Sequence, residues 1–227
     1  MRKKIFKLLI FFYLFFFTSP LFSFSASEKL PFRKGEAISY RIKWKGIYIG
    51  RAKLVFNNEI VFTTNTLNFK DTERIKGDGH YYPVEVRRDI RLFGNSIKIL
   101  EEYDQKEKKL SIFRQTSKGI KKRVITSKDK MHHPILLIYY CRTQELSVGK
   151  SWIVNFPLIG KCKLEITRLE EISTPIGKFF AYRIESSPAK IRFWISADKR
   201  RLPLKVERID SFFTRSSFTI TGVTEEL

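Results

Sequence analysis

Apolar and polar residues alternate along most of this chain. Large apolar side chains occupy every second position, with mostly polar residues between them, in residues 40–45, 51–56, 96–99, 163–167, 180–185, 191–196 and 202–207. A period of two residues is typical of a β-strand, because successive side chains point to opposite faces. The pattern therefore predicts antiparallel strands with one face buried and one face in water.

Short clusters of turn-forming residues separate these segments, for example Lys45-Gly46, Asn57-Asn58, Gly94-Asn95 and Thr174-Pro175-Ile176-Gly177. Turn signals at such short intervals favour hairpin connections between neighbouring strands. By this spacing rule we expect about a dozen strands. They begin near residues 37, 47, 60, 82, 96, 108, 120, 151, 161, 178, 190, 202 and 215.

One segment breaks the alternation. Residues 134–140 (PILLIYY) are apolar on every side, and Arg142 follows shortly after them. Because Pro is favoured at the first helical position, we expect a short helix that is buried all round. It divides about seven strands from about six. The fold class is therefore all-β and mainly antiparallel, with residues 26–227 forming one domain: a broad curved sheet or open barrel with one short buried helix.

The first 25 residues have the layout of a secretory signal peptide. A basic segment (residues 1–7) precedes an apolar run (residues 8–17), and small residues at Ser23 and Ser25 mark a cleavage point before Ala26. We therefore expect residues 1–25 to be a signal peptide, and the mature protein to be periplasmic or secreted. The alternative is an uncleaved signal that anchors the chain in a membrane.

The mature chain carries a large positive charge. The full sequence has a formal net charge of +21, and residues 1–25 contain four basic residues and no acid, which leaves +21 − 4 = +17. Such a charge attracts anionic lipid, lipopolysaccharide and other polyanions, while export argues against nucleic acid as a partner. The competing interpretation is that these dispersed charges form a solvated face.

Cys141 and Cys162 are the two cysteines of the chain. An oxidising compartment permits one disulfide between them, which makes the pair a disulfide candidate. Both also occupy apolar positions of predicted elements, where free thiols are common, so we favour two buried thiols over a disulfide. Neither cysteine has a second Cys at the short spacing of a zinc site.

The sequence contains no recognisable catalytic motif, such as Gly-x-Ser-x-Gly, a Gly-rich phosphate loop or His-Glu-x-x-His. His80 lies in a Gly-rich turn, and His132 and His133 precede the predicted helix, so we interpret them as partly exposed loop residues. The pairs Glu101-Glu102 and Glu170-Glu171 are adjacent on strands and point to opposite faces, which does not suit an acid/base couple. We expect no catalytic residue, no metal and no cofactor.

Aromatic residues are frequent in the predicted strands. A curved sheet lined by large apolar side chains can hold an acyl chain, although an ordinary β core needs the same residues. Trp194 has the opposite parity to Phe193 and Ile195, so we expect it at the surface, where it suits an interface. The candidate ligand-binding residues are Trp44, Trp152, Trp194 and Arg192.

Six sequence pieces occur in a characteristic order. They are Gly35-Glu36-x-x-x-Tyr40-x-x-x-Trp44-x-Gly46-x-x-x-Gly50-x-Ala52, Tyr81-Tyr82-Pro83-Val84, residues 134–143, Val148-Gly149-Lys150-Ser151-Trp152, Thr174-Pro175-x-Gly177-x-Phe179, and Trp194-Ile195-Ser196-x-Asp198-x-Arg200-Arg201-Leu202-Pro203. In this order the chain resembles an uncharacterised bacterial exported family, domain-of-unknown-function family three-one-zero-eight (DUF3108). The resemblance spans about residues 35–224 and implies secretion and a β-rich fold. It supplies no catalytic residue, substrate or cofactor.

The leading interpretation is a non-enzymatic cell-envelope protein that binds an amphiphilic or anionic, lipid-like envelope ligand in the concavity of the sheet. Basic strand residues favour an anionic headgroup, and peripheral membrane contact or an envelope protein partner fits the same properties. One alternative is a structural or assembly module that acts by strand addition at an open edge. The other is a hydrolase of envelope polymers, which needs a cleft that joins His80 or His132 to a carboxylate and a hydroxyl.

Overall fold

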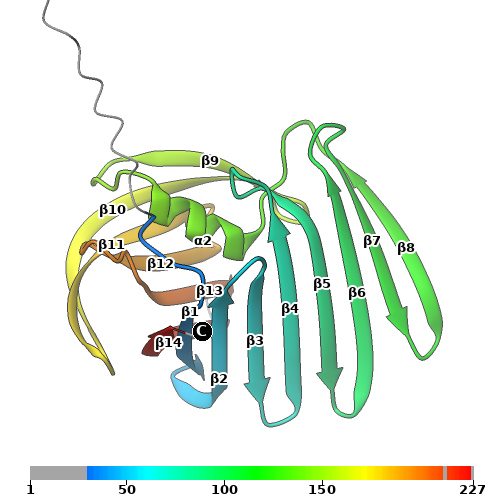
Figure 1. Ribbon diagram of the computed structural model, residues 1–227, viewed down its shortest axis with the longest axis horizontal. Coiled ribbons are helices and arrows are strands. Elements are labelled where there is room, and N and C mark those ends of the chain that lie inside the picture. Colours follow the sequence, from blue (N-terminus) through cyan, green and yellow to red (C-terminus); the bar gives the residue numbers. More distant parts are fainter. Residues whose placement is uncertain (1–29, 212–213, 226–227) are drawn as a thin grey trace, which may run out of the picture.

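A computed structural model describes residues 30–211 and 214–225 of the chain, so the predicted signal peptide lies outside the described residues. The described part forms one antiparallel sheet with a helix against it (Figure 1). The strands before the helix are β1 (Glu36–Trp44), β2 (Ile47–Phe56), β3 (Ile60–Thr66), β4 (Phe69–Gly77), β5 (Pro83–Leu92), β6 (Asn95–Asp104), β7 (Lys109–Thr116) and β8 (Gly119–Thr126). The helix α2 (Pro134–Thr143) is followed by β9 (Ser151–Phe156), β10 (Gly160–Thr174), β11 (Gly177–Ser187), β12 (Ile191–Ser196), β13 (Pro203–Ser211) and β14 (Thr214–Glu225).

The sheet contains all 14 of these strands in the order β8-β7-β6-β5-β4-β3-β2-β1-β14-β13-β12-β11-β10-β9. Consecutive strands therefore pair as hairpins within each half, and the β1–β14 pairing joins the two halves. In the part of the chain that the structure describes, β8 and β9 form the two edges and do not pair with each other. The sheet is strongly curved but open, which confirms the predicted fold class.

Strand β4 is the element that the alternation pattern missed. Its buried positions include Asp71 and Glu73 as well as Ile75, so its inward face does not read as apolar. The group before the helix therefore contains eight strands instead of the predicted seven. The other predicted strands are present, with starts displaced by at most a few residues.

Helix α2 lies on the concave face of the curved sheet (Figure 1). Pro134 occupies its first turn, and the Nδ1 atom of His133 accepts a hydrogen bond from the Ile135 amide at 3.4 Å, which caps the helix. Leu136 and Tyr139 belong to a cluster with residues of β1–β7 and β11–β14, whereas Leu137 and Cys141 pack into a second cluster with β9–β12. The helix thus fills the space between the two halves, as predicted for an element buried on all sides.

The helix runs three residues beyond the predicted segment, and this places Arg142 in its last turn with a fully buried side chain. The guanidinium forms a bidentate ion pair with Glu36 of β1, with Nη1–Oε1 and Nη2–Oε2 distances of 2.6 and 2.8 Å. It also donates to the carbonyl oxygens of Pro31 and Arg200. A buried charge needs partners of this kind, so the pair fixes the helix against β1 and the β12–β13 connection.

The two cysteines contribute to the same apolar cluster, Cys141 from α2 and Cys162 from β10. Both thiols are buried and free, so the structure contains no disulfide between these two residues. Burial raises the pKa of the Cys141 thiol to about 12 and also raises the pKa of the Cys162 thiol. The disulfide candidate is therefore replaced by two apolar, unreactive thiols.

Candidate functional site

The sheet has two faces with different side chains. Ile38, Tyr40 and Leu54 of β1 and β2 point toward α2 and belong to the buried cluster that contains Leu136 and Tyr139. The residues between them point the other way, onto what we call the outer face. One row of directly paired residues crosses this face from β11 to β3: Arg183, Trp194, Lys205, Thr219, Arg41, Arg51 and Asn65.

A groove of about 860 Å³ lies on the outer face over β1–β3. Four cationic side chains line it, together with the hydroxyl and amide groups of neighbouring residues; we call it the cationic groove. No Asp, Glu, His or Cys is among its lining residues, which are Ser39, Tyr40, Arg41, Lys43, Gly46, Tyr48, Arg51, Ala52, Lys53, Thr63, Asn65 and Thr221. This composition suits binding of an anion by donors and offers no acid/base couple.

The cations of the groove are held close together by strand register. Arg41 and Arg51 are direct partners in the β1–β2 ladder. Directly opposite residues have Cβ atoms about 5 Å apart, and like charges in that arrangement are destabilising. Among the described residues, no ion pair neutralises Arg41, Lys43 or Arg51. An anion in the groove would relieve this repulsion.

The β1–β2 hairpin shapes one end of the groove. Its turn residues Lys45 and Gly46 have φ angles of 48° and 82°, the left-handed values that a two-residue type I′ turn requires. A bulge follows, because Ile42 pairs with Gly50 while Lys43 pairs with Tyr48. A Cβ atom on Gly50 would lie 2.2 Å from the Asn65 carbonyl oxygen, so only glycine allows β2 and β3 to approach here.

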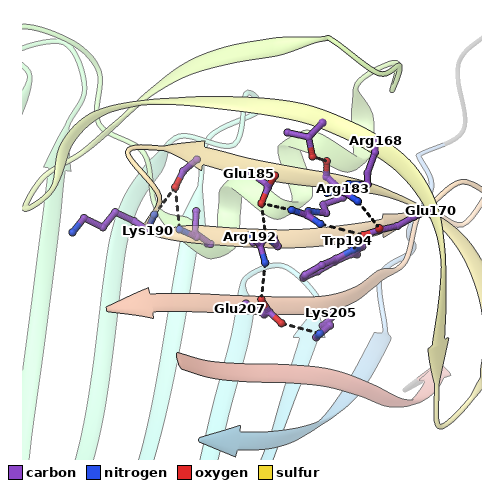
Figure 2. Close-up of polar contacts among 12 residues, drawn as sticks. Arg168, Glu170, Arg183, Glu185, Lys190, Arg192, Trp194, Lys205 and Glu207 are labelled. Atoms are coloured by element: carbon purple, nitrogen blue, oxygen red, sulfur yellow. Dashed lines mark hydrogen bonds and ion pairs between the residues drawn. The ribbon is translucent and has the colours of Figure 1, made fainter. Parts of the chain in front are cut away.

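A second set of cations lies on the same face over β10–β13 and forms a paired network (Figure 2). Glu185 accepts hydrogen bonds from Arg183 and Arg192 at 2.8 and 2.5 Å. Glu207 lies 3.4 Å from Arg192 and 2.8 Å from the Lys205 ammonium. Burial alone would raise the pKa of the Glu185 carboxyl, but the hydrogen bonds from the two arginines outweigh it and lower that pKa. These cations are held as structural ion pairs.

Trp194 belongs to this network and is not at the surface as predicted. It lies on the outer face, as its parity requires, yet its exposure is only 5%. Its indole Nε1 donates to Glu170 at 2.7 Å (Figure 2), and the Lys205 ammonium lies 4.8 Å from its ring centroid. Strand parity fixes the face but cannot show that Glu170 and the neighbouring long side chains cover the ring.

The other candidate residues lie far apart. Arg192 is engaged with Glu185 and Glu207 in the paired network. Trp44 ends β1 beside the cationic groove, is 45% exposed and carries the Lys45 ammonium 4.9 Å from its ring centroid. Trp152 lies on the edge strand β9, half-buried against the cluster of Cys141 and Cys162. The structure brings Arg192 and Trp194 together, with the guanidinium carbon 5.9 Å from the ring centroid, but Trp44 and Trp152 lie on other strands.

Of the three histidines, His133 differs from the prediction of partly exposed loop residues. His133 is buried, and its Nε2 atom lies 3.1 Å from the Glu73 carboxylate of β4. Burial would raise the pKa of Glu73, but the hydrogen bond and charge of His133, together with the charge of Arg88, lower it. His132 accepts a hydrogen bond from the Asn155 amide, and burial lowers its pKa. Both residues tie the start of α2 to neighbouring strands, and His80 alone is exposed.

A further charged group extends this cluster on β4 and β5. Arg88 forms an ion pair with Asp71 and lies 3.8 Å from Glu73. Burial raises the pKa of Asp71 above its ordinary range despite the Arg88 hydrogen bond. In the part of the chain described, no group of three His, Cys, Asp or Glu side chains is arranged to hold a metal ion. No helix in the described part of the chain is both long enough and apolar enough to span a membrane.

The sequence pattern did not reveal the cationic groove, because its four cations occupy ordinary solvent-facing positions of two amphipathic strands. These residues are Arg41, Lys43, Arg51 and Lys53. A signal was nevertheless present. The two-residue turn Lys45-Gly46 sets the register of the hairpin, and with one bulge it places Arg41 opposite Arg51. A like-charge cross-strand pair is unfavourable for folding alone, which marks the position as worth testing for a ligand.

Comparison with known proteins supports the fold. Residues 39–216 match the sequence model of a family described as "Protein of unknown function (DUF3108)". A "Beta-barrel-like Protein of Domain of Unknown Function DUF1849 from Brucella abortus" is similar in structure over 85% of this chain and 98% of that chain, with a TM-score of 0.51 and 7% identity. At this identity the likeness concerns the fold alone. A search of curated proteins gave no match.

Proposed function

The chain belongs to the DUF3108 family of proteins of unknown function, and we propose that it is a non-enzymatic binding protein that holds the anionic headgroup of an amphiphilic envelope ligand in the cationic groove. The observation that carries this proposal is the set of Arg41, Lys43 and Arg51, which converge without an ion-pair partner among the described residues. Arginine forks and lysine ammonium groups match phosphate and carboxylate oxygens.

The surroundings of the groove favour an amphiphile over a bare anion. Ile47 and Tyr48 at the end of the hairpin, and Ile49 in the bulge, are exposed apolar or aromatic side chains that adjoin the groove. The concave face beside α2 is occupied by the two buried clusters, which leaves the outer face as the better location for a ligand. An anionic head among the cations and an apolar part along the hairpin fit these surfaces together.

We further propose that the protein works in the periplasm or outside the cell. This rests on the signal-peptide layout of residues 1–25, which lie outside the described residues. Anionic lipid and lipopolysaccharide are the abundant amphiphiles of such a compartment, and the net charge of +17 calculated for the mature chain favours them.

Titration calorimetry with a soluble short-chain anionic phospholipid tests the groove directly. The double variant Arg41→Gln/Arg51→Gln should weaken binding by at least about tenfold, because two charge-assisted hydrogen-bonding groups are lost. Lys98→Gln is the matched control: Lys98 is an exposed cation on the outer face of β6 and does not line the groove. We expect it to bind like the natural chain.

Two additional probes identify the part of the ligand that is recognised. A zwitterionic phospholipid of the same chain length should bind weakly, whereas equal binding of both lipids would overturn the headgroup proposal. Inorganic phosphate binding as tightly as the anionic lipid would show a site for the free anion. If the double variant binds like the natural chain, the groove is not the site.

A second candidate function is protein assembly through strand addition. The observation that favours it is the pair of unpaired edges, β8 and β9, in the described part of the sheet. Strand β8 is exposed along most of its length and carries Lys121, Lys122 and Arg123, which are residues that discourage indiscriminate edge pairing. Crosslinking from cysteines placed along β8 in intact cells would test this function, since a specific partner should be captured at alternate positions.

A further inference from the structure

Four hairpin turns lie side by side along one edge of the β1–β8 half of the sheet. They connect β1 to β2, β3 to β4, β5 to β6 and β7 to β8, and they line the lower side of the molecule in Figure 1. The Phe93 amide donates to the Asn68 carbonyl oxygen at 3.0 Å, which joins two of these turns directly. We call this row of turns the hairpin edge.

Each turn of the hairpin edge presents a large apolar side chain to solvent. Trp44 and Ile47 flank the first turn. Leu67 and Phe93 lie in the second and third turns, and Ile120 lies directly after the fourth. Leu67 is 94% exposed, Phe93 73% and Ile120 69%. Exposed apolar residues that recur along one edge, instead of being scattered singly, indicate an interaction surface.

Phe93 occupies its exposed position with a strained backbone. Its φ angle is 47°, and it is followed by Gly94 at 80°, so the two form a type I′ turn. The first position of such a turn favours Asn, Asp or Gly, and a bulky aromatic residue there is strained. Since Phe93 is also mostly exposed, packing does not compensate for this strain. Strained residues of this kind are concentrated at functional sites.

The charges of the hairpin edge are of one sign. Residues 43–49, 65–70, 91–96 and 116–121 contain no Asp or Glu, and their basic residues are Lys43, Lys45, Lys70, Arg91, Lys118 and Lys121. The opposite edge is mixed in sign: its turns and the strand ends beside them contain Glu59, Asp78, Asp104 and Glu107 together with Lys106 and Lys108. Val84, at 47%, is the one large apolar residue with high exposure in residues 57–59, 78–84 and 105–108.

We propose that the hairpin edge docks onto the surface of an anionic lipid bilayer, with its apolar turn residues entering the headgroup region and its Lys and Arg residues contacting anionic headgroups. Exposed aromatic and aliphatic side chains flanked by basic residues are the combination that binds such an interface. The inference does not depend on the occupant of the cationic groove, because Leu67, Phe93 and Ile120 do not line it. Docking would place the mouth of the groove beside the headgroups.

Cosedimentation with lipid vesicles tests this docking, using protein isolated from its own cells with the N-terminus determined by mass spectrometry. The chain should bind vesicles of phosphatidylcholine with added phosphatidylglycerol and bind pure phosphatidylcholine much less. The double variant Leu67→Ser/Phe93→Asn should bind the anionic vesicles at least about tenfold more weakly. Its thermal stability should be unchanged or higher, because Asn suits the type I′ turn.

The opposite edge supplies matched controls. Val84→Ser removes the most exposed large apolar side chain of that edge, and Lys106→Glu reverses an exposed charge in the β6–β7 turn. Both variants should bind like the natural chain. Lys118→Glu at the hairpin edge should weaken anionic vesicle binding severalfold. Because all variants have the same N-terminus, differences in vesicle binding among them come from the substituted turn residues.

Equal binding to both vesicle types would overturn the proposal, as would equal losses at the two edges. The proposal would also be overturned if the Leu67→Ser/Phe93→Asn variant bound anionic vesicles like the natural chain. If analytical ultracentrifugation instead shows self-association that the Leu67→Ser/Phe93→Asn variant abolishes, without vesicle binding, the hairpin edge joins two copies of this chain.

Discussion

The outer face carries two sets of cations whose environments differ. Over β10–β13, Arg183, Arg192 and Lys205 each lie within ion-pair distance of Glu170, Glu185 or Glu207. Over β1–β3, Arg41 and Arg51 oppose each other with no carboxylate among the residues lining the groove. One paired row runs through both sets by way of Lys205 and Thr219.

Basic residues with the same sequence pattern therefore have different roles in the folded chain. Both sets alternate with apolar residues in the same way, and neither is distinguished by composition. Carboxylates on neighbouring strands form ion pairs with the first set of cations. Each of these pairs contributes to the stability of the fold through hydrogen bonds and partial burial. The second set retains its repulsion in the folded state, and a ligand would have to supply the missing negative charge.

Removal of Glu207 should have the largest effect. It is buried and pairs with both Arg192 and Lys205, so Glu207→Ala leaves two half-buried cations without this partner. We expect a loss of about 3 kcal/mol in the free energy of unfolding, measured by urea denaturation. Glu171→Ala is the control, since its exposed pair with Lys178 at 3.7 Å should contribute under about 1 kcal/mol. Equal losses would show that the buried pairs of Glu207 contribute no more than an exposed ion pair.

The indole hydrogen bond of Trp194 should have a smaller effect. Trp194→Phe keeps most of the ring but removes the donor to Glu170, which should lower the free energy of unfolding by about 1 kcal/mol. In the described residues the indole of Trp152 has no hydrogen-bond partner, so Trp152→Phe is the matched substitution and should lower it less. A larger loss for Trp152→Phe would show that ring packing, not the network, dominates.

The paired network should also make stability depend on pH. Because the folded-state pKa of Glu185 is lowered, its contribution is fully present above the ordinary glutamate pKa of about 4.3 and is lost as the pH falls through the folded value. Glu185→Gln should therefore flatten the acid limb of a plot of unfolding free energy against pH. A variant of the groove, Arg51→Gln, should leave that limb unchanged, since no carboxylate lines the groove.

The smallest expected effect comes from the groove itself. Arg51→Gln should raise the free energy of unfolding by a few tenths of a kcal/mol at low ionic strength, because it removes a like-charge cross-strand pair. Added salt should abolish this gain by screening the repulsion. If instead the variant is clearly less stable at low salt, Arg51 has a structural role and the contrast between the two sets fails.

The predictable part of the fold followed from local patterns. Alternation identified most strands, and Pro134 with the apolar residues after it identified α2. Strand β4 escaped because Asp71 and Glu73 face inward, where contacts with Arg88 and His133 from other elements compensate their burial. The burial of Trp194 and of Arg142 was not predicted for the same reason, because each side chain depends on a partner that is distant in the sequence.

Local sequence patterns were sufficient to predict the alternating faces of the strands, the hairpin turns, the place of the helix and the family. These properties depend on neighbouring residues, whose geometry is set by backbone stereochemistry and side-chain period. The pairing of cations with carboxylates and the alignment of turns along one edge became apparent only in the folded chain. Those outcomes depend on the order and curvature of 14 strands. Alternation assigns these residues to the same kind of strand position, and the curvature of the sheet decides which of them come together.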